Sequence, residues 1–122
     1  MKQDWEVIRS ILLRLEQAPA ANAYLNAEAI AEYPEQEVAY NMRLLSQADF
    51  IKAEFIESST GDGAIAAAMA NHMTNRGHDL LDTTRNDTVW AKIKEKFKSK
   101  GLEMTFDLVL TVGKKVMEEF LS

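Results

Sequence analysis

Cysteine is absent from this 122-residue sequence, so disulfide bonds, thiolate metal ligands and cysteine nucleophiles are all excluded. No apolar run approaches the ~20 residues that a membrane-spanning helix needs. The first residues become amphipathic at once and contain no signal-peptide core. Internal repeats and linkers long enough to separate domains are absent as well. These absences predict a cytoplasmic protein with no membrane partner.

The residues that are present occur in ordinary globular proportions, with 47% apolar and 27% charged side chains. This composition argues against disorder, and the length suffices for a small buried core. The formal net charge is -5, and it is unevenly distributed along the chain.

Residues 1–84 carry thirteen acidic and six basic side chains, whereas residues 85–101 carry six basic and two acidic ones. Clustered cations supply most of the affinity for phosphate backbones, so any polyanion contact should involve Lys92–Lys100. A solvated helix on an acidic protein explains the same lysines equally well. The charge pattern therefore leaves both interpretations open.

A first helix is predicted by apolar residues at helical spacing from Trp5 onward, with Asp4 as its N-cap. Pro19 should stop this helix, and a loop should follow over Ala20–Asn26. The stretch Leu25–Tyr33 is ambiguous, because its alanines suit a short helix but it can equally hold a short strand.

A second helix is predicted over Pro34–Ala48, where residues placed about 100° apart separate into two faces. Glu35 and Glu37 suit the positive end of its dipole. The apolar face comprises Val38, Met42 and Leu45, and the opposite face comprises Gln36, Tyr40, Arg43 and Gln47.

A β-hairpin should follow this helix. Its predicted parts are a strand over Phe50–Ile56, a turn over Ser58–Gly63 and a partner strand over Ala64–Met73. The alanine content of Ala64–Met73 would equally allow a helix.

Three further helices complete the predicted order. Thr74 caps the first, which extends through Leu80, Leu81 and Arg85. Asp87 or Thr88 caps the second, whose apolar stripe is Val89, Trp90, Ile93 and Phe97 before Gly101 ends it. Thr105 caps the third, which spans Phe106–Leu121.

Four stretches of the chain resemble one known family. They are DWEVIRSILLRLE, EYPEQEVAYNMRLLSQADFI, MTNRGHDLLDTTRNDTVWAKIKEK and KGLEMTFDLVLTVGKKV. The most specific part is the motif T-x-x-G-H-[DE]-x-L-D-x-x-R with a following tryptophan, formed here by Thr74, Gly77, His78, Asp79, Leu81, Asp82, Arg85 and Trp90. On these residues the chain resembles the bacterial and prophage family of domain of unknown function 2513. The resemblance implies a winged-helix-like first two thirds with a helical C-terminal piece, and it assigns no catalytic residue.

The sequence departs from the family pattern at two places. Family members often have Tyr-His where this chain has Tyr40-Asn41, so an essential role for that histidine is not expected. They often have glycine in the helix-to-strand turn, where this chain has Asp49-Phe50. Aspartate tolerates the left-handed conformation that glycine would adopt, so Asp49 is expected to occupy it.

These patterns together predict a mainly helical α+β fold: a winged helix-turn-helix with a small β-hairpin and a helical C-terminal extension. We expect a winged-helix-like domain over residues 1–86. A two-helix extension over residues 87–122 should pack on it or form a dimer contact. The apolar stripe of the last helix, which includes Val116 and Phe120, is the predicted homodimer surface.

The predicted function is that of a small, non-enzymatic DNA-binding regulator of phage or prophage type. The predicted DNA-binding residues are Gln36, Tyr40, Arg43, Gln47, Lys94 and Lys98. Glutamine can pair with adenine and arginine with guanine, while lysines contact phosphates. The alternative is a protein-protein interaction module, in which an acidic winged-helix scaffold binds a host protein or mimics nucleic acid.

No catalytic residue, metal site or cofactor is predicted. His72 and His78 match no zinc-binding pattern, although Asp79 and Asp82 lie nearby in the sequence. Acidic residues near the start of a helix are explained by its dipole alone. The turn Ser58–Gly63 lacks the lysine of a phosphate-binding loop and is predicted to be a simple turn.

Overall fold

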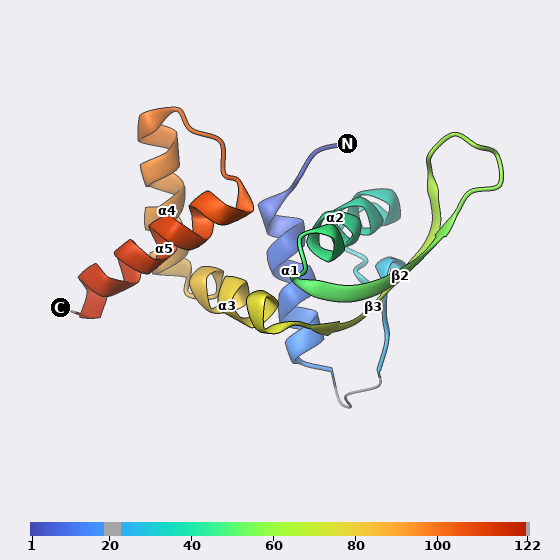
Figure 1. The fold of residues 1–122 in the computed structure, drawn as a ribbon, viewed down its shortest axis with the longest axis horizontal. Helices are drawn as coiled ribbons and strands as arrows, with labels where there is room; N and C mark the ends of the chain where they lie inside the picture. Colours follow the sequence, from blue (N-terminus) through green and yellow to red (C-terminus); the bar gives the residue numbers. More distant parts are fainter. Residues whose placement is uncertain (19–22, 122) are drawn as a thin grey trace. The chain divides into compact units, whose positions relative to one another are not determined.

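The computed structural model describes residues 1–18 and 23–121, which form two compact units, Met1–His78 and Asp79–Ser122. The described residues are mainly helical, with one three-stranded antiparallel sheet (Figure 1). The boundary between the units falls inside a helix, whereas the sequence suggested a division after residue 86, which stays a prediction. Pro19 and the start of the predicted loop lie outside the described residues.

Along the chain, helix α1 is followed by a short strand and a 3-10 helix, then by helix α2, the β-hairpin and three further helices. The first unit contains α1 (Trp5–Glu16), β1 (Leu25–Asn26), the short 3-10 helix η1 (Ala27–Ala29), α2 (Glu35–Gln47), β2 (Ile51–Glu57) and β3 (Ile65–Met73). Helix α3 (Asn75–Thr84) begins in the first unit and continues into the second, which also contains α4 (Asp87–Lys100) and α5 (Phe106–Leu121).

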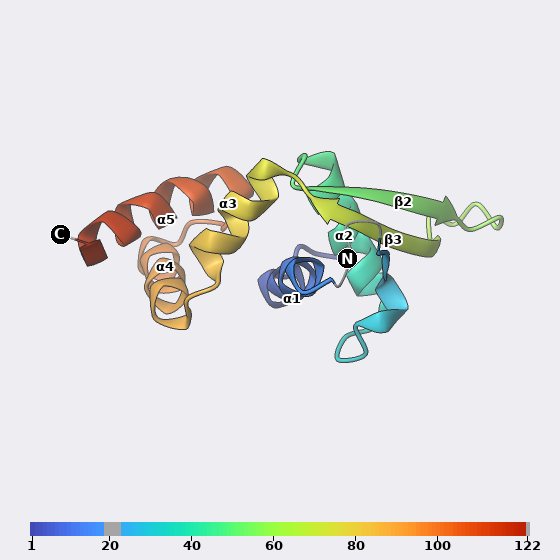
Figure 2. The same ribbon diagram turned by 90° about the horizontal axis from the view of Figure 1, so that it is seen from below.

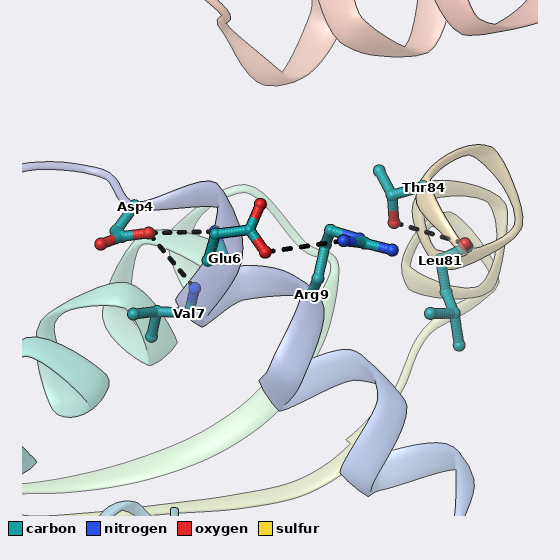
Figure 3. A network of polar contacts seen from close by, with 6 residues as sticks. All are labelled: Asp4, Glu6, Val7, Arg9, Leu81 and Thr84. Carbon is teal, nitrogen blue, oxygen red and sulfur yellow. Dashed lines mark hydrogen bonds and ion pairs between the residues drawn. The ribbon is translucent and has the colours of Figure 1, made fainter. Parts of the chain in front are cut away.

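Helix α1 begins where the sequence predicts. The Asp4 carboxylate accepts hydrogen bonds from the backbone N–H groups of Glu6 and Val7, at 3.0 and 3.3 Å (Figure 3). One turn later, Arg9 forms an ion pair with Glu6 at 3.6 Å (Figure 3). Asp4 is therefore the predicted N-cap, and its side chain satisfies N–H groups that have no partner inside the helix.

Asn41 joins the start of α1 to α2 and is fully buried. Its side-chain oxygen accepts a hydrogen bond from the Asp4 backbone N–H at 2.9 Å. Its amide group donates to the Glu37 carbonyl at 2.8 Å. The position where family members often carry histidine therefore has a structural role in this chain, since a buried polar side chain is costly unless it is hydrogen-bonded.

The ambiguous stretch after residue 24 forms both elements that its sequence allowed, β1 and then η1. The sheet has the order β1-β3-β2, and both pairings are antiparallel. Leu25 lies opposite Ala70, while Phe55 lies opposite Ala68. The partner strand over the alanine-rich segment is therefore confirmed, and the helical alternative for it is wrong.

Helix α2 packs on β2 and β3, while α1 packs on α2 and β3 (Figure 2). The predicted apolar face of α2 is confirmed, because Val38, Met42 and Leu45 are all fully buried. Pro34 lies one residue earlier than predicted in the helix, at the N-cap position, with an extended ψ of 137°. Its fixed φ of -58° suits that position as well.

The turn between α2 and β2 is held by the start of α3. Asp49 adopts the left-handed conformation (φ 64°), as predicted for a residue in place of glycine. The Thr74 hydroxyl donates to the Asp49 carbonyl, and the Thr74 N–H donates to the Phe50 carbonyl at 3.0 Å. Gly77 then lies so close to this turn that an added Cβ would be 2.0 Å from the Phe50 carbonyl oxygen.

Helix α4 is capped by Asn86, not by the predicted Asp87 or Thr88. The Asn86 side-chain oxygen accepts hydrogen bonds from the N–H groups of Thr88 and Val89, at 2.9 and 3.0 Å. Asp87 and Thr88 lie inside the first turn, where they cannot cap the helix themselves. Gly101 ends α4 in the left-handed conformation, as predicted.

The second unit is built on a close contact between α3 and α5. An added Cβ at Gly113 would lie 2.1 Å from the Thr83 methyl group. The hydroxyls of Thr83 and Thr84 donate to carbonyls one turn earlier in α3, and Figure 3 shows the Thr84–Leu81 bond. The buried side chains of this unit include Leu80, Leu81, Trp90, Ile93, Phe97, Val109 and Val116.

Candidate binding face on helix α2 and the hairpin

The predicted DNA-reading side of α2 lies beside the β2–β3 hairpin. Gln36, Tyr40 and Arg43 are partly exposed, and Gln47 is exposed at the end of the helix. The first three line a shallow hollow of about 430 Å³, whose other wall is formed by Met1 and by Asp62, Gly63, Ala64 and Ile65. We call these residues, together with Gln47, Phe55 and Glu57, the α2–hairpin face.

Gln36 is already fully engaged by the hairpin. Its side-chain NH₂ donates to the Ile65 carbonyl at 2.7 Å, and its side-chain oxygen accepts from the Ile65 N–H at 3.3 Å. Reading an adenine would require the same two groups. This glutamine therefore holds α2 to the start of β3, beside the turn of the hairpin, and reading a base would break both bonds.

Arg43 is also turned towards the hairpin. Its guanidinium lies 3.3 Å from a Glu57 carboxylate oxygen and 5.3 Å from the centre of the Phe55 ring. The ion pair is weak, because the Glu57 side chain is 76% exposed, and such pairs contribute about 0–1 kcal/mol. The pairing nonetheless places a carboxylate beside the one basic side chain of the α2–hairpin face.

The hairpin tip adds a further negative charge. The Asp62 carboxylate accepts a hydrogen bond from the Ala64 N–H at 2.9 Å. This bond, together with one from the Thr60 side chain, lowers the pKa of Asp62. Gly61 and Gly63 have positive φ values of 72° and 79°, which the tight turn requires.

Acidic side chains outnumber basic ones over this whole region. Residues 34–65 contain six acidic side chains and two basic ones, Arg43 and Lys52. Glu35 and Glu37 flank the exposed side of α2 at its start. Negative charges at these positions repel a phosphate backbone, and Arg43 is the one cation of the α2–hairpin face that could attract it.

Lys94 and Lys98 belong to the second unit, whereas the other four predicted residues belong to the first. Both lysines are exposed on α4. The Lys94 ammonium lies 5.6 Å from the Trp90 ring centre, a cation–π contact within one helix. The structure thus groups Gln36, Tyr40 and Arg43 in one hollow of the first unit and places the two lysines in the second unit.

Comparison with known proteins identifies the family. Residues 2–103 match the family described as "Hypothetical protein (DUF2513)". The chain belongs to this family. It is also 35% identical over 122 residues to an uncharacterized protein of Haemophilus influenzae, and the match covers 100% of both chains. No solved structure matches the chain.

The structure explains much of the DUF2513 motif by packing. The Thr74 hydroxyl accepts a hydrogen bond from the Gly77 N–H at 3.2 Å, which closes the first turn of α3. Leu81 and Trp90 are buried. The first and fourth motif positions therefore secure the turn between α2 and β2, and they need no ligand to account for them.

Four residues of the motif are exposed, namely His78, Asp79, Asp82 and Arg85. Asp82 forms an ion pair with Arg85 at 3.6 Å on the surface of α3. His78 is exposed, and His72 lies on β3 opposite Lys52. Among residues 1–18 and 23–121, no group of three histidine, aspartate or glutamate side chains could hold a metal ion.

Sequence reasoning missed Phe55, Glu57 and Ile65 as parts of the face. The alternation of β2 was a usable signal, because Phe55 and Glu57 are two residues apart and so point to the same side of a strand. No pattern in the local sequence indicates the register that brings Ile65 beside Gln36.

None of the helices in the described part of the chain has both the length and the apolar character that a membrane span needs.

Proposed function

We propose that this chain is a non-enzymatic protein-interaction module on a winged-helix scaffold, and that its α2–hairpin face binds a protein partner. The observation that carries the proposal is the engagement of Gln36 and Arg43 by the hairpin on an acidic surface. Side chains held in place before binding lose little entropy on association, which suits a preformed docking face. The partner chemistry is basic, because Glu57 and Asp62 would meet it.

The element order supports the winged-helix part of the proposal. The first unit runs α1, β1, η1, α2, β2 and β3, and its sheet order is β1-β3-β2. Helix α2 would be the recognition helix, and the tip between β2 and β3 would be the wing. In this scheme η1 takes the place of the first helix of the helix-turn-helix.

Replacing Glu57 with glutamine separates protein binding from DNA binding, because the two functions predict changes of opposite sign. The partner is captured by the full chain and identified by mass spectrometry. We expect Glu57→Gln to weaken binding of this partner about threefold, since an exposed ion pair between Glu57 and a basic side chain of the partner is lost. Glu28→Gln, which removes an exposed charge from η1, is the matched control and should leave binding unchanged.

DNA binding would respond in the other direction. Glu57→Gln frees Arg43 and removes a carboxylate, so it would strengthen retardation of genomic DNA fragments in gel shifts. Retardation by the wild type that Glu57→Gln strengthens would contradict the protein-binding proposal.

A DNA-binding regulator of phage or prophage type is the second candidate, and it is favoured by the exposed lysines of α4. If it is correct, Arg43→Ala should cost about 1–3 kcal/mol of binding free energy and relax the sequence preference. Replacing Lys94 and Lys98 with glutamine should weaken binding to all sequences and reduce its salt dependence. Fluorescence anisotropy at several salt concentrations measures both effects. Absence of binding to genomic fragments at low salt would exclude this function.

Self-association through α5 is a further proposal, but the structure changes the residue that tests it. Val116 is fully buried, so Val116→Asp would unfold its own unit. Phe120 is 47% exposed and is the better position. We expect Phe120→Asp to convert a dimer into a soluble monomer in light scattering. A wild-type protein that is already monomeric at high concentration would show that the dimer proposal is wrong.

A further inference from the structure

A second surface with a different chemistry lies between α4 and α5. It is a groove of about 310 Å³ within the second unit, lined by Lys96, Phe97, Lys100, Leu102, Val112, Lys115 and Glu119. Three of the four charged residues are lysines, and the other three residues are apolar. This groove shares no residue with the α2–hairpin face.

The end of α4 fixes the apolar part of the groove. The Leu102 N–H donates to the Phe97 carbonyl at 3.2 Å, and the Gly101 N–H donates to the Lys98 carbonyl at 3.3 Å. These two bonds form a Schellman motif, which brings the side chains after and before the helix end together. Phe97 is buried, whereas Leu102 is 53% exposed, so Leu102 is an apolar side chain held open to solvent.

Helical spacing divides the lysines of α4 into two sets. Residues four apart share a side of a helix, so Lys96 and Lys100 lie together on the groove side. Lys94 and Lys98 lie together on another side, where Lys94 contacts the Trp90 ring. The charge of α4 is therefore presented on two surfaces, and only one of them has an apolar floor.

The combination of lysines and an apolar floor indicates the ligand class. Phosphate groups of DNA would use the lysines but gain nothing from Phe97, Leu102 and Val112. A protein segment can use both, because an apolar side chain is desolvated while its flanking carboxylates meet the rim. Glu119 lies at this groove too, so it would disfavour a carboxylate beside it and help to set the orientation of the segment.

We propose that the α4–α5 groove binds an acidic segment of a protein partner, which inserts one large apolar side chain between Phe97, Leu102 and Val112. The carboxylates of the segment pair with Lys96, Lys100 and Lys115. This inference goes beyond the proposed function, since it concerns the other unit and a partner of the opposite charge. The chain would then present one acidic and one basic docking surface.

Two fluorescein-labelled synthetic peptides test the proposal with the full chain. Both consist of glutamate and serine residues, and they differ only in a central phenylalanine or alanine. We expect the phenylalanine peptide to bind about tenfold more tightly in anisotropy titrations, because a buried aromatic side chain contributes most of the affinity. Its addition should shift the backbone NMR signals of Phe97, Leu102 and Val112.

The two sets of lysines provide matched variants. Lys96→Gln with Lys100→Gln should weaken binding of the phenylalanine peptide about fivefold, since two rim charges are lost. Lys94→Gln with Lys98→Gln removes the same charge from the other side of α4 and should change binding less than about twofold. Unchanged far-UV circular dichroism confirms that each variant is folded.

Each other outcome would overturn the proposal. If substitution of either lysine pair weakened binding equally, the peptide would be attracted by the overall positive charge of α4 and would not be bound in the groove. Equal affinity for the two peptides would mean that the apolar floor binds nothing. If neither peptide binds while vesicles of phosphatidylcholine and phosphatidylglycerol shift the same NMR signals, the groove is a lipid-binding surface instead.

Discussion

Gly77→Ala is expected to lower the free energy of unfolding by about 3 kcal/mol, because the added methyl group has no room beside the turn between α2 and β2. In an open helix the same change would stabilise the protein by up to about 1 kcal/mol, since alanine is the better helix former. Here the new Cβ would lie 2.0 Å from the Phe50 carbonyl oxygen and 3.1 Å from the Met73 Cβ. A backbone carbonyl cannot rotate away as a side chain does, so the unfavourable contact decides the sign.

Urea denaturation followed by circular dichroism measures this effect. His78→Ala is the matched control, because His78 is the exposed neighbour of Gly77 on α3. We expect it to stay within about 0.5 kcal/mol of the wild type. An unchanged or more stable Gly77→Ala variant would show that α3 does not approach the turn between α2 and β2 this closely.

Leu45→Ala is expected to lower the free energy of unfolding by about 2–5 kcal/mol, because it removes a fully buried side chain from the face of α2 that packs on the sheet. The cost combines lost burial with the cavity left behind, which the surrounding side chains fill only in part. The carbonyl of Leu45 also accepts the Phe50 N–H at 2.9 Å, so the residue lies next to the turn that Gly77 secures.

Thermal and urea denaturation both report on Leu45→Ala. Gln47→Ala, two residues later in the same helix, is the control, and its exposed side chain should make it nearly neutral. A near-neutral Leu45→Ala would place the side chain outside the core. The candidate binding face of α2 would then have to be assigned again, because it was defined as the opposite side of the helix.

The α2–hairpin face shows how far local patterns predict a site. The helical wheel correctly separated Val38 and Met42 from Gln36 and Arg43, because helical periodicity depends only on the sequence of that segment. It could not show that Gln36 bonds to Ile65, which lies 29 residues away. A side chain that a helical wheel places on the exposed side can thus be hydrogen-bonded to a distant segment in the folded protein. Its role is then to hold that segment, and it is no longer available to read a base.

The local features of this protein follow from short stretches of its sequence. Asp4 caps α1, Asp49 takes the left-handed conformation and Gly101 ends α4, because each depends on the chemistry of a few adjacent residues. The choice of Asn86 over Asp87 as a cap was also local, but neighbouring residues with similar propensity made it ambiguous.

Other features depend on contacts between segments that are distant in the sequence, and these required the folded structure. β1 is two residues long and exists as a strand because β3 pairs with it. Arg43 meets Glu57, and Gly77 meets Phe50, because register and packing bring separated segments together. Lys96 and Lys100 likewise become part of a groove only because α5 supplies Val112 and Lys115 to it. Such contacts arise from burial of apolar surface over the whole unit, and no short stretch of sequence contains them.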